Sequence, residues 1–424
     1  MIRIYLKQAW SLLKENPLIS GLSIAGTALA IAAVMLIILV IQVRMAEYAP
    51  ESNRGRMLHV IAMRAVEKKN DGSTNNGYMG KSVVRELFYN LKTPQVVSGY
   101  ARRTVSVNAA GKRTFSKYSA TYTDERFWNI FDYEFLEGAP FTREESESGV
   151  CKAIISEKLA RRLFGKTEGI TGQRLLVNKK EYSICGIVED VSRTARFAYA
   201  DLWMPYNSNA AMETPANVCG GLTGYFNVAM LAGSTSDFSA IRAEVEKETR
   251  QFNANSPEYE ISFFSGPLSN FDLIITNYMG FIKEIPYAEW FLTQGGFILF
   301  LLLLPALNMI GITITSFRKR RAEIGLRKAF GATAGSVFSQ VVNENLVITF
   351  IGGVFGLVFS IIMLWLTRDI FFPSGSEINL SMLIRPEMFL ASLFFIFLLN
   401  LMCAGIPAWR AGKYNIVKSL NNQE

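Results

Sequence analysis

Few side chains in this 424-residue chain have the types and spacing that enzymatic chemistry requires. His59 is the one histidine, so no histidine pair can hold a metal and any histidine-based triad would have to use this residue. Its place in the apolar run 57–63 predicts an ordinary strand residue. The Gly-Lys-Thr sequence at 165–167 repeats the end of a phosphate-binding loop, but Ala160 replaces the first glycine and a predicted helix precedes it where the motif has a strand. We therefore predict that the chain is not an enzyme and binds no metal or cofactor.

The cysteines give no disulfide framework. Three of the four fall in the long segment 44–289, and the fourth, Cys403, falls in an apolar stretch. Three is an odd number, so at least one of these thiols stays free, and the sequence leaves open a single bridge among Cys151, Cys185 and Cys219. We expect no structural disulfide.

Charged residues are missing from four long stretches, at 16–43, 290–317, 345–367 and 388–409. A helix needs about 20 apolar residues to cross a bilayer, so each stretch is long enough. A cleavable signal peptide is the alternative for the first stretch, but its apolar run is too long for one. We therefore predict an α-helical membrane protein whose four apolar stretches lie in the lipid bilayer. Its four transmembrane helices are expected at 18–43, 290–317, 337–367 and 387–409.

Basic residues predict the orientation of these helices. Segments 1–17, 318–336 and 410–424 together carry 12 Lys and Arg residues, whereas 368–386 carries two. Cytoplasmic segments carry the excess of basic residues, so both termini are expected in the cytoplasm, 368–386 is a periplasmic loop and 44–289 lies outside. The net charge of +8 is thus a topology signal, and we expect no nucleic-acid partner. Residues 1–17 predict an amphipathic helix on the cytoplasmic leaflet, or else an extension of the first span.

Segment 44–289 is far too long for a loop and predicts a large α+β extracytoplasmic domain inserted between the first two spans. The polar stretch 67–81 predicts an exposed, mobile loop, and 178–180 predicts a hairpin turn. Strands are predicted at 57–63, 103–109, 113–123, 152–156, 174–178, 182–188, 201–206, 225–232 and 259–264. Helices are predicted at 81–91, 124–131, 156–164 and 237–252, the last with Asp237 as its N-cap.

The densest basic cluster lies in the cytoplasmic link between the second and third spans. It predicts a short helix from about 320 to 330 that ends at Gly331, because glycine favours the left-handed conformation found after helix ends. Contact with anionic lipid alone is the alternative interpretation. The run EIGLRKAFGA at 323–332, with Arg320 before it and Asn308 in the span, resembles the signature of FtsX/MacB-type permeases of ATP-binding-cassette (ABC) systems.

The resemblance extends over nearly the whole chain. Outside the membrane it is carried by the stretches 122–141, 152–165 and 182–191, which resemble the periplasmic core domain of that family. In the tail it is carried by Pro407, Ala408, Ala411 and Leu420, whereas Asn415 and Ile416 depart from the family's closing pattern.

This resemblance implies a permease subunit in a bacterial inner membrane that transmits the motion of a separate cytoplasmic ATPase to its periplasmic domain. ATP and Mg would be bound by that ATPase, since no fused ATPase precedes the first span. The cargo would be a peptide, an antibiotic or a lipoprotein. Further expected partners are a second permease copy or a paralogue in a dimer, and a periplasmic adaptor or an outer-membrane channel. The residues expected to couple to the ATPase are Arg320, Glu323, Ile324, Gly325, Leu326, Arg327, Lys328 and Gly331.

Two alternatives stay open. The first is an FtsX-like regulator of a periplasmic cell-wall hydrolase, although that relative has a much smaller outside domain. The second is a membrane-anchored sensor without an ATPase, which the link at 323–332 disfavours. No charged residue lies in the middle of a span, which argues against an ion-coupled transporter.

Features within the spans suggest how force is carried. Pro305 with Asn308 predicts a kink in the second span, and an extended helix is expected to run from Asn270 into that span. Small residues let helices approach closely, so they predict either a dimer seam or packing within one subunit. The candidate stripe in the first span consists of Gly21, Ala25, Ala28 and Ala32, and the third span has Gly352 and Gly356.

Overall fold

The computed structural model describes residues 17–68, 73–109, 115–213, 219–300, 330 and 333–371, together with 390 and 394. Its chain divides into two compact units. One unit comprises Arg44–Tyr287 and is called the core domain below. The other, called the helical unit, contains the chain up to Val43 and from Ala288 onward, apart from a short stretch near 375.

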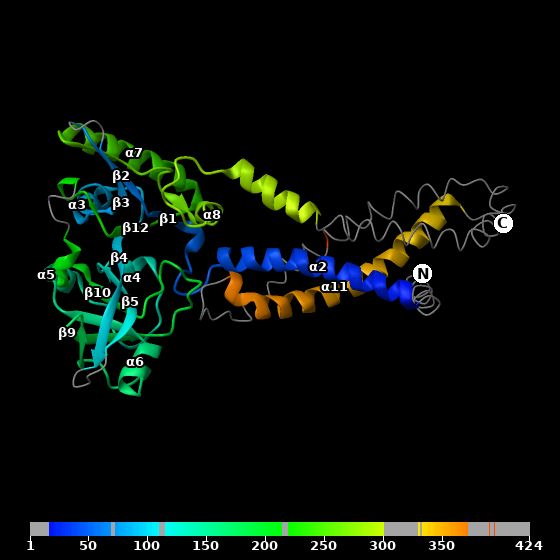
Figure 1. Cartoon of the computed structure of the whole chain (residues 1–424), viewed down its shortest axis with the longest axis horizontal. Coiled ribbons are helices and arrows are strands. Elements are labelled where there is room, and N and C mark those ends of the chain that lie inside the picture. The colour runs from blue at the N-terminus through cyan, green and yellow to red at the C-terminus, as the bar shows by residue number, and fades with distance from the viewer. Residues whose placement is uncertain are drawn as a thin grey trace. The chain divides into compact units, whose positions relative to one another are not determined.

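The core domain is built on one mixed sheet to which all fourteen of the described strands belong (Figure 1). Its main path runs β13-β2-β3-β12-β4-β5-β10-β7-β9-β6, with β1, β8, β11 and β14 pairing beside it. The strands up to β7 are β1 (Met57–Val60), β2 (Met63–Glu67), β3 (Thr74–Met79), β4 (Val96–Ala109), β5 (Ser116–Thr123), β6 (Phe135–Gly138) and β7 (Lys152–Ser156). The remaining strands are β8 (Arg174–Val177), β9 (Lys180–Val188), β10 (Leu202–Pro205), β11 (Thr223–Gly224), β12 (Phe226–Leu231), β13 (Tyr259–Ser262) and β14 (Leu268–Ser269).

Strand β4 joins the two halves of the sheet. Its first residues pair with β12, its middle pairs with β5, and its last three residues pair with β8. Side chains alternate between the two faces of a strand, and the core follows this period. Met57 and Tyr100 belong to one buried cluster, whereas their neighbours Leu58 and Ala101 belong to the other.

Short helices cover both faces of the sheet. One cluster takes side chains from α3 (Lys81–Glu86), α6 (Glu157–Phe164) and α7 (Phe238–Asn255), and the other from α4 (Phe127–Ile130) and α8 (Asn270–Ile275). The remaining labelled α-helix of the domain is α5 (Arg143–Ser148). The 3-10 turns are η1 (Arg54–Arg56), η2 (Phe88–Asn90), η3 (Tyr206–Ser208), η4 (Ala210–Met212), η5 (Cys219–Gly221) and η6 (Thr235–Asp237). The mixed α and β content expected of this domain is confirmed.

Several local predictions are confirmed by particular residues. The hairpin turns at Asn178 and Lys179, which both have positive φ, as the two central residues of a type I′ turn require. Gly165 ends α6 in the left-handed conformation, so the Gly-Lys-Thr sequence follows a helix and forms no phosphate loop. His59 lies in β1, where its ring stacks on Phe197.

One local prediction was wrong. Residues Thr74–Met79 form β3 where a mobile loop was expected, because β2 supplies backbone partners that the local sequence does not reveal. Asp237 stands at the N-cap position of α7, as predicted, but its side chain forms no cap hydrogen bond there and instead accepts one from the amide of Ser234 in the preceding turn. The structure contains no disulfide among the three cysteines of the core domain, because Cys151, Cys185 and Cys219 are all free.

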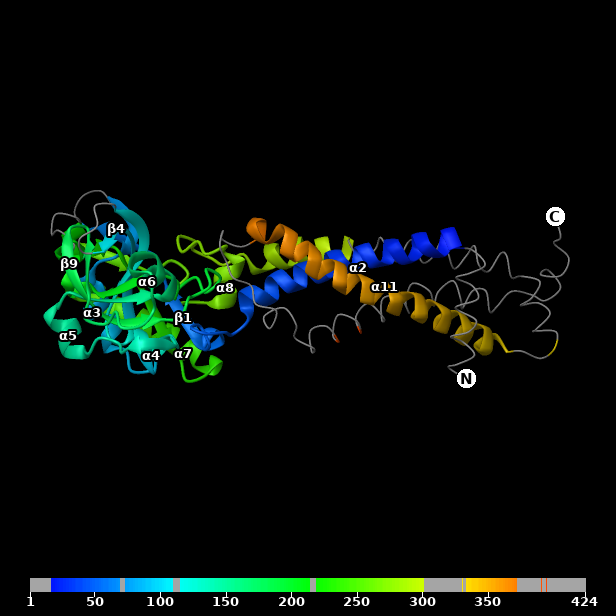
Figure 2. The same ribbon diagram turned by 90° about the horizontal axis from the view of Figure 1, so that it is seen from below.

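The helical unit contains α2 (Pro17–Met45), whose last two residues belong to the core domain, and α11 (Ala334–Phe371). The two helices pack against each other through Leu39, Val43 and Leu364, and Figures 1 and 2 show them side by side. Among the described residues one helix is long and apolar enough to cross a membrane, with its apolar window at Phe350–Thr367, and Ala32–Met45 is a shorter apolar helix.

Candidate functional site at the end of helix α2

Most of the residues predicted to act in coupling lie outside the described part of the chain. This applies to the second-span residues Pro305 and Asn308 and to the link residues Arg320, Glu323, Ile324, Gly325, Leu326, Arg327, Lys328 and Gly331. The predicted stripe on α2 is described. Gly21 and Ala25 are exposed in the single copy, Ala28 is half-buried and Ala32 is buried, so the first two residues are open to a neighbour and the last is already covered.

A buried ion pair lies where α2 ends inside the core domain. Nε and Nη2 of Arg54 both lie 2.7 Å from Oε2 of Glu51, and the two side chains are each 3% exposed. The guanidinium also lies 4.4 Å from the centre of the Tyr48 ring. Burial lowers the pKa of Arg54, but the Glu51 carboxylate and Tyr48 raise it by more, so the group stays charged.

The Arg54 guanidinium caps the end of α2. Its Nη1 donates to the carbonyl oxygens of Arg44, at 3.1 Å, and Ala46, at 2.9 Å. The last carbonyls of a helix have no partner within the helix, and a buried carbonyl without a donor destabilises the fold. Asn270, the first residue of α8, donates from Nδ2 to the same Arg44 oxygen at 3.0 Å. One carbonyl thus joins the end of α2 to the start of α8.

Glu51 ties this group to the rest of the domain. Its Oε1 accepts hydrogen bonds from the amides of Phe197, at 2.8 Å, and Ala198, at 3.1 Å. Arg54 donates to the Thr194 carbonyl at 3.3 Å. We call Glu51, Arg54 and Asn270, with the carbonyls they hold, the helix-end cluster.

Along the chain, helix α8 comes between this cluster and the predicted second span at 290–317. Its cap residue Ser269 follows Leu268, which pairs with β1. Asp272 accepts hydrogen bonds from Arg242 of α7, at 2.8 Å, and from the Tyr287 hydroxyl, at 2.5 Å. Burial, together with this bond to Asp272, raises the pKa of Tyr287 to about 12.

The helix expected to run from Asn270 into the second span is interrupted. Helix α8 ends at Ile275, and Asn277 and Tyr278 have φ values of 49° and 60°. A helix does not continue through the left-handed conformation, so the chain turns here, and a new helix begins at Tyr287. The hydrogen bond from Tyr287 to Asp272 spans this interruption.

The helix-end cluster joins the end of α2, the start of α8 and the loop at 194–198 through hydrogen bonds. No group of three or more His, Cys, Asp or Glu side chains within the described residues could hold a metal ion. Sequence reasoning missed the cluster because its partners lie far apart in the chain. The available signal was local, namely Glu51 and Arg54 three residues apart, directly after a long apolar helix.

The chain matches two family models that together cover most of its length. Residues 20–248 match the MacB-like periplasmic core domain, and residues 295–416 match the FtsX-like permease C-terminal domain. The chain therefore belongs to the MacB/FtsX-type family of ABC transporter permeases.

Two curated relatives illustrate this membership. The chain is 22% identical over 420 residues to the macrolide export ATP-binding/permease protein MacB of Escherichia coli (strain K12). The matched residues cover 98% of this chain and 60% of that protein. It is 24% identical over 237 residues to the ABC transporter permease YknZ of Bacillus subtilis (strain 168), covering 55% of this chain and 54% of that one. The chain thus spans little more than half the length of these relatives.

Two solved structures are also similar. The periplasmic region of MacB from Actinobacillus actinomycetemcomitans has a TM-score of 0.35 at 14% identity, covering 51% of this chain and 92% of that one. The extracellular domain of the YknZ transporter from Gram-positive bacteria has a TM-score of 0.33 at 16% identity, covering 47% of this chain and 99% of that one.

Proposed function

We propose that this permease transmits ATP-driven motion of a separate cytoplasmic ATPase to its core domain, and that this motion exports or extracts a peptide, an antibiotic or a lipoprotein. The observation that carries the proposal is the helix-end cluster. Directional hydrogen bonds join the last turn of α2, through Arg54 and Asn270, to the loop at 194–198 and to α8. A displacement of α2 along its axis would therefore move these elements together.

Helix α11 supports the same proposal. It is continuous over 38 residues from Ala334, which lies within the last residues of the predicted link at 318–336. At 1.5 Å per residue it is about 57 Å long, whereas the hydrocarbon core of a bilayer is about 30 Å thick. A continuous helix that exceeds the membrane can pass a push at one end to the other without an intervening hinge.

The partners follow from this mechanism. The ATPase would hold ATP and Mg, and the link residues Arg327 and Lys328 would face acidic groups on it. Two permease copies, or one copy and a paralogue, would form a dimer in the bacterial inner membrane with both termini in the cytoplasm. The open residues Gly21 and Ala25 would lie toward the second copy. A periplasmic adaptor or an outer-membrane channel would complete an exporter.

Affinity purification of the full chain in mild detergent tests the proposal. We expect an ATP-binding subunit to co-purify, and the substitution Glu323→Lys to abolish its recovery, because the reversed charge disrupts the link that docks on it. The matched control is Glu147→Lys, a charge reversal on the exposed helix α5 of the core domain. Absence of any co-purifying ATPase, or equal recovery with both variants, would refute the proposal.

A further inference from the structure

Exposed apolar side chains of the core domain are concentrated directly after α8. Met279, Phe281 and Tyr287 are 58%, 48% and 41% exposed and lie within nine residues of one another. The other large apolar residues that are exposed in the described part of the domain are scattered along the chain. A contiguous apolar surface, unlike a single exposed residue, marks a contact with a membrane or with another protein.

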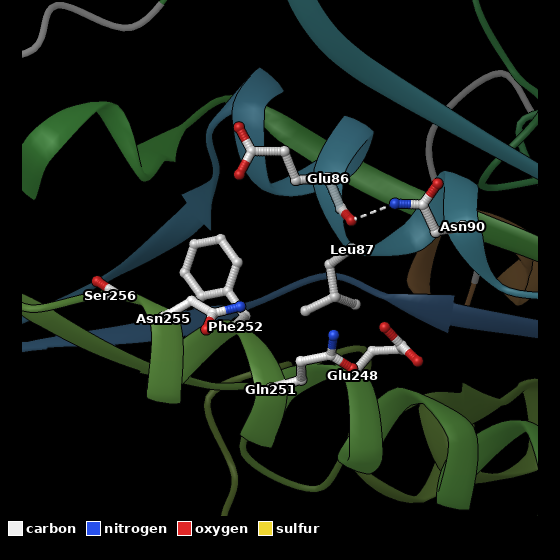
Figure 3. Close-up of a pocket in the computed structure, with 8 residues that line it drawn as sticks. All are labelled: Glu86, Leu87, Asn90, Glu248, Gln251, Phe252, Asn255 and Ser256. Atoms are coloured by element: carbon white, nitrogen blue, oxygen red, sulfur yellow. Dashed lines mark hydrogen bonds between the residues drawn. The ribbon is translucent and has the colours of Figure 1, made fainter.

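A hollow elsewhere on the domain has the opposite character. It lies between α7 and the segment of α3 and η2, has a volume of about 380 Å³ and is lined mostly by polar side chains, among them Glu86, Glu248, Gln251 and Asn255 (Figure 3). Polar side chains stay hydrated, whereas apolar side chains gain free energy by leaving water. The residues after α8 therefore favour an apolar partner, and this hollow does not.

We call residues 278–283 the α8 turn, and its burial alternates from one residue to the next. Tyr278 packs against the core and Gly280 is buried, whereas Met279 and Phe281 are exposed. The outward direction of Met279 and Phe281 thus follows from the inward direction of their neighbours. The two apolar side chains lie on the same, outer side of the turn.

Close contacts hold the α8 turn in this orientation. A Cβ atom at Gly280 would lie 2.5 Å from Cγ1 of Ile61, so only glycine allows the backbone to approach the β1–β2 connection this closely. The Ser265 hydroxyl donates a hydrogen bond to the carbonyl oxygen of Ile282. The turn is therefore fixed to the domain, and it presents its apolar side chains without first having to become ordered.

The α8 turn adjoins both points at which the chain enters the core domain. Asn270, at the start of α8, donates to the Arg44 carbonyl at the end of α2, and Asp272 accepts from the Tyr287 hydroxyl. Trp290 follows one helical turn after Tyr287, and Trp and Tyr side chains concentrate at the boundary between membrane and water. Because the turn leaves α8 directly, it belongs to the end of the domain from which the predicted spans depart.

We propose that the α8 turn inserts into the leaflet nearest the core domain, with Met279 and Phe281 among the upper parts of the acyl chains. Phe281 also packs edge-on against Phe264, with ring centres 5.6 Å apart, which extends the apolar surface. Lys283 and Glu284 are exposed beside it and cancel in charge. Apolar insertion, and not attraction to anionic lipid, therefore holds the turn at the membrane.

The test replaces Phe281 by the photo-crosslinking residue p-benzoylphenylalanine in the full chain, in nanodiscs of phosphatidylcholine, and identifies the adducts by mass. The matched control carries the same residue at Phe115, which is 46% exposed. Phe115 precedes β5 at the far end of β4 from the strands that adjoin α8. We expect the yield of lipid adducts to be at least about tenfold higher at position 281 than at position 115, because only the inserted side chain meets lipid continuously.

A second position guards against disturbance of the contact between Phe281 and Phe264. The same residue at Met279, which has no such ring partner within the described residues, should give lipid adducts in the same excess over position 115. Equal yields at 115 and at both turn positions, adducts to a second copy of the chain in place of lipid, or no lipid adduct at 279 and 281 would overturn the proposal.

Nanodiscs that also contain phosphatidylglycerol test the apolar basis of the contact. The adduct yield at position 281 should stay the same, because the exposed charges of the turn cancel, and a rise above about threefold would overturn this basis. Both measurements proceed without ATP or an ATPase. Failure of the membrane contact is therefore distinct from failure of the coupling proposal.

Discussion

Removal of the Arg54 side chain should destabilise the core domain more than removal of any exposed ion pair. Arg54→Met leaves the Glu51 carboxylate buried without its counter-ion and leaves the Ala46 carbonyl without the donor described above. Breaking a buried pair by removing one partner costs about 3–5 kcal/mol, because the remaining charge stays desolvated. We therefore expect a fall of that size in the free energy of unfolding. Arg250→Met is the control, since Arg250 and Glu246 are 68% and 69% exposed, and an exposed pair is worth about 0–1 kcal/mol.

A double-mutant cycle tests whether Arg54 acts through Glu51. Glu51→Gln keeps an acceptor for the amides of Phe197 and Ala198 but removes the charge. Combined with Arg54→Met it leaves no unpaired charge, so the double variant should be more stable than the sum of the two single losses predicts, by about 1–3 kcal/mol.

Denaturant unfolding of the full chain in detergent, with hydrogen exchange of peptides from 44–60 and 192–200, measures these effects. We expect faster exchange in both segments for Arg54→Met and in neither for Arg250→Met. A loss below about 1 kcal/mol for Arg54→Met, or losses that add within about 0.5 kcal/mol, would refute the reasoning that Arg54 and Glu51 form one coupled, buried unit.

Two further predictions concern the sheet and pH. Asn253 of α7 accepts from the amide of Ile261 and donates to its carbonyl, both at 2.8 Å, so it covers the backbone of β13. Asn253→Ala should lower the free energy of unfolding by about 1–3 kcal/mol and speed hydrogen exchange of the Ile261 amide. Asn255→Ala, at an exposed position of the same helix, should do neither. Equal exchange of the Ile261 amide in both variants would contradict this. Burial lowers the pKa of His59 to about 4, so the folded state resists protonation of this ring and loses stability as pH falls from about 6.5 toward 4. Burial raises the pKa of Asp124 to about 6, so the folded state resists ionisation of this carboxyl and loses stability as pH rises from about 4 to 6. The two effects on the free energy of unfolding are each about 3 kcal/mol and oppose each other. As pH is raised from about 4.5 to 6, stability should therefore fall in His59→Phe, which keeps only the Asp124 effect, and rise in Asp124→Asn, which keeps only the His59 effect. The same slope in both variants would refute the assignment.

Local chemistry determined which parts of the fold could be predicted. Ser156 before an apolar helical repeat and Gly165 after it define α6, and Asn178 with Lys179 defines the hairpin, because each of these signals acts within a few residues. Strand β3 has no such signal. Its sequence is polar and rich in asparagine, and its conformation depends on partners supplied by β2 and β12.

The helix-end cluster was unpredictable for the same reason. From sequence, Glu51 and Arg54 are an ordinary charged pair in a loop after an apolar helix, and nothing nearby shows that Phe197, Ala198 and Asn270 complete their hydrogen bonds. The interruption after α8 was also missed, since only the positive φ values of Asn277 and Tyr278 reveal it. The coupling residues of the link stay predictions, because they lie outside the described residues.

The chemistry of the cluster explains why a charged pair occupies a buried position that an apolar side chain could fill. A helix that ends inside a folded domain brings its last carbonyls with it, and these need donors that an apolar residue does not have. The planar guanidinium supplies several donors at once, so Arg54 can hold Arg44 and Ala46 while pairing with Glu51. Apolar contacts are non-directional and allow neighbouring groups to slide, whereas hydrogen bonds hold both distance and angle. Under the transmission proposed above, the pair would hold the end of α2 at a fixed distance and angle to the sheet, which a larger apolar core would not do.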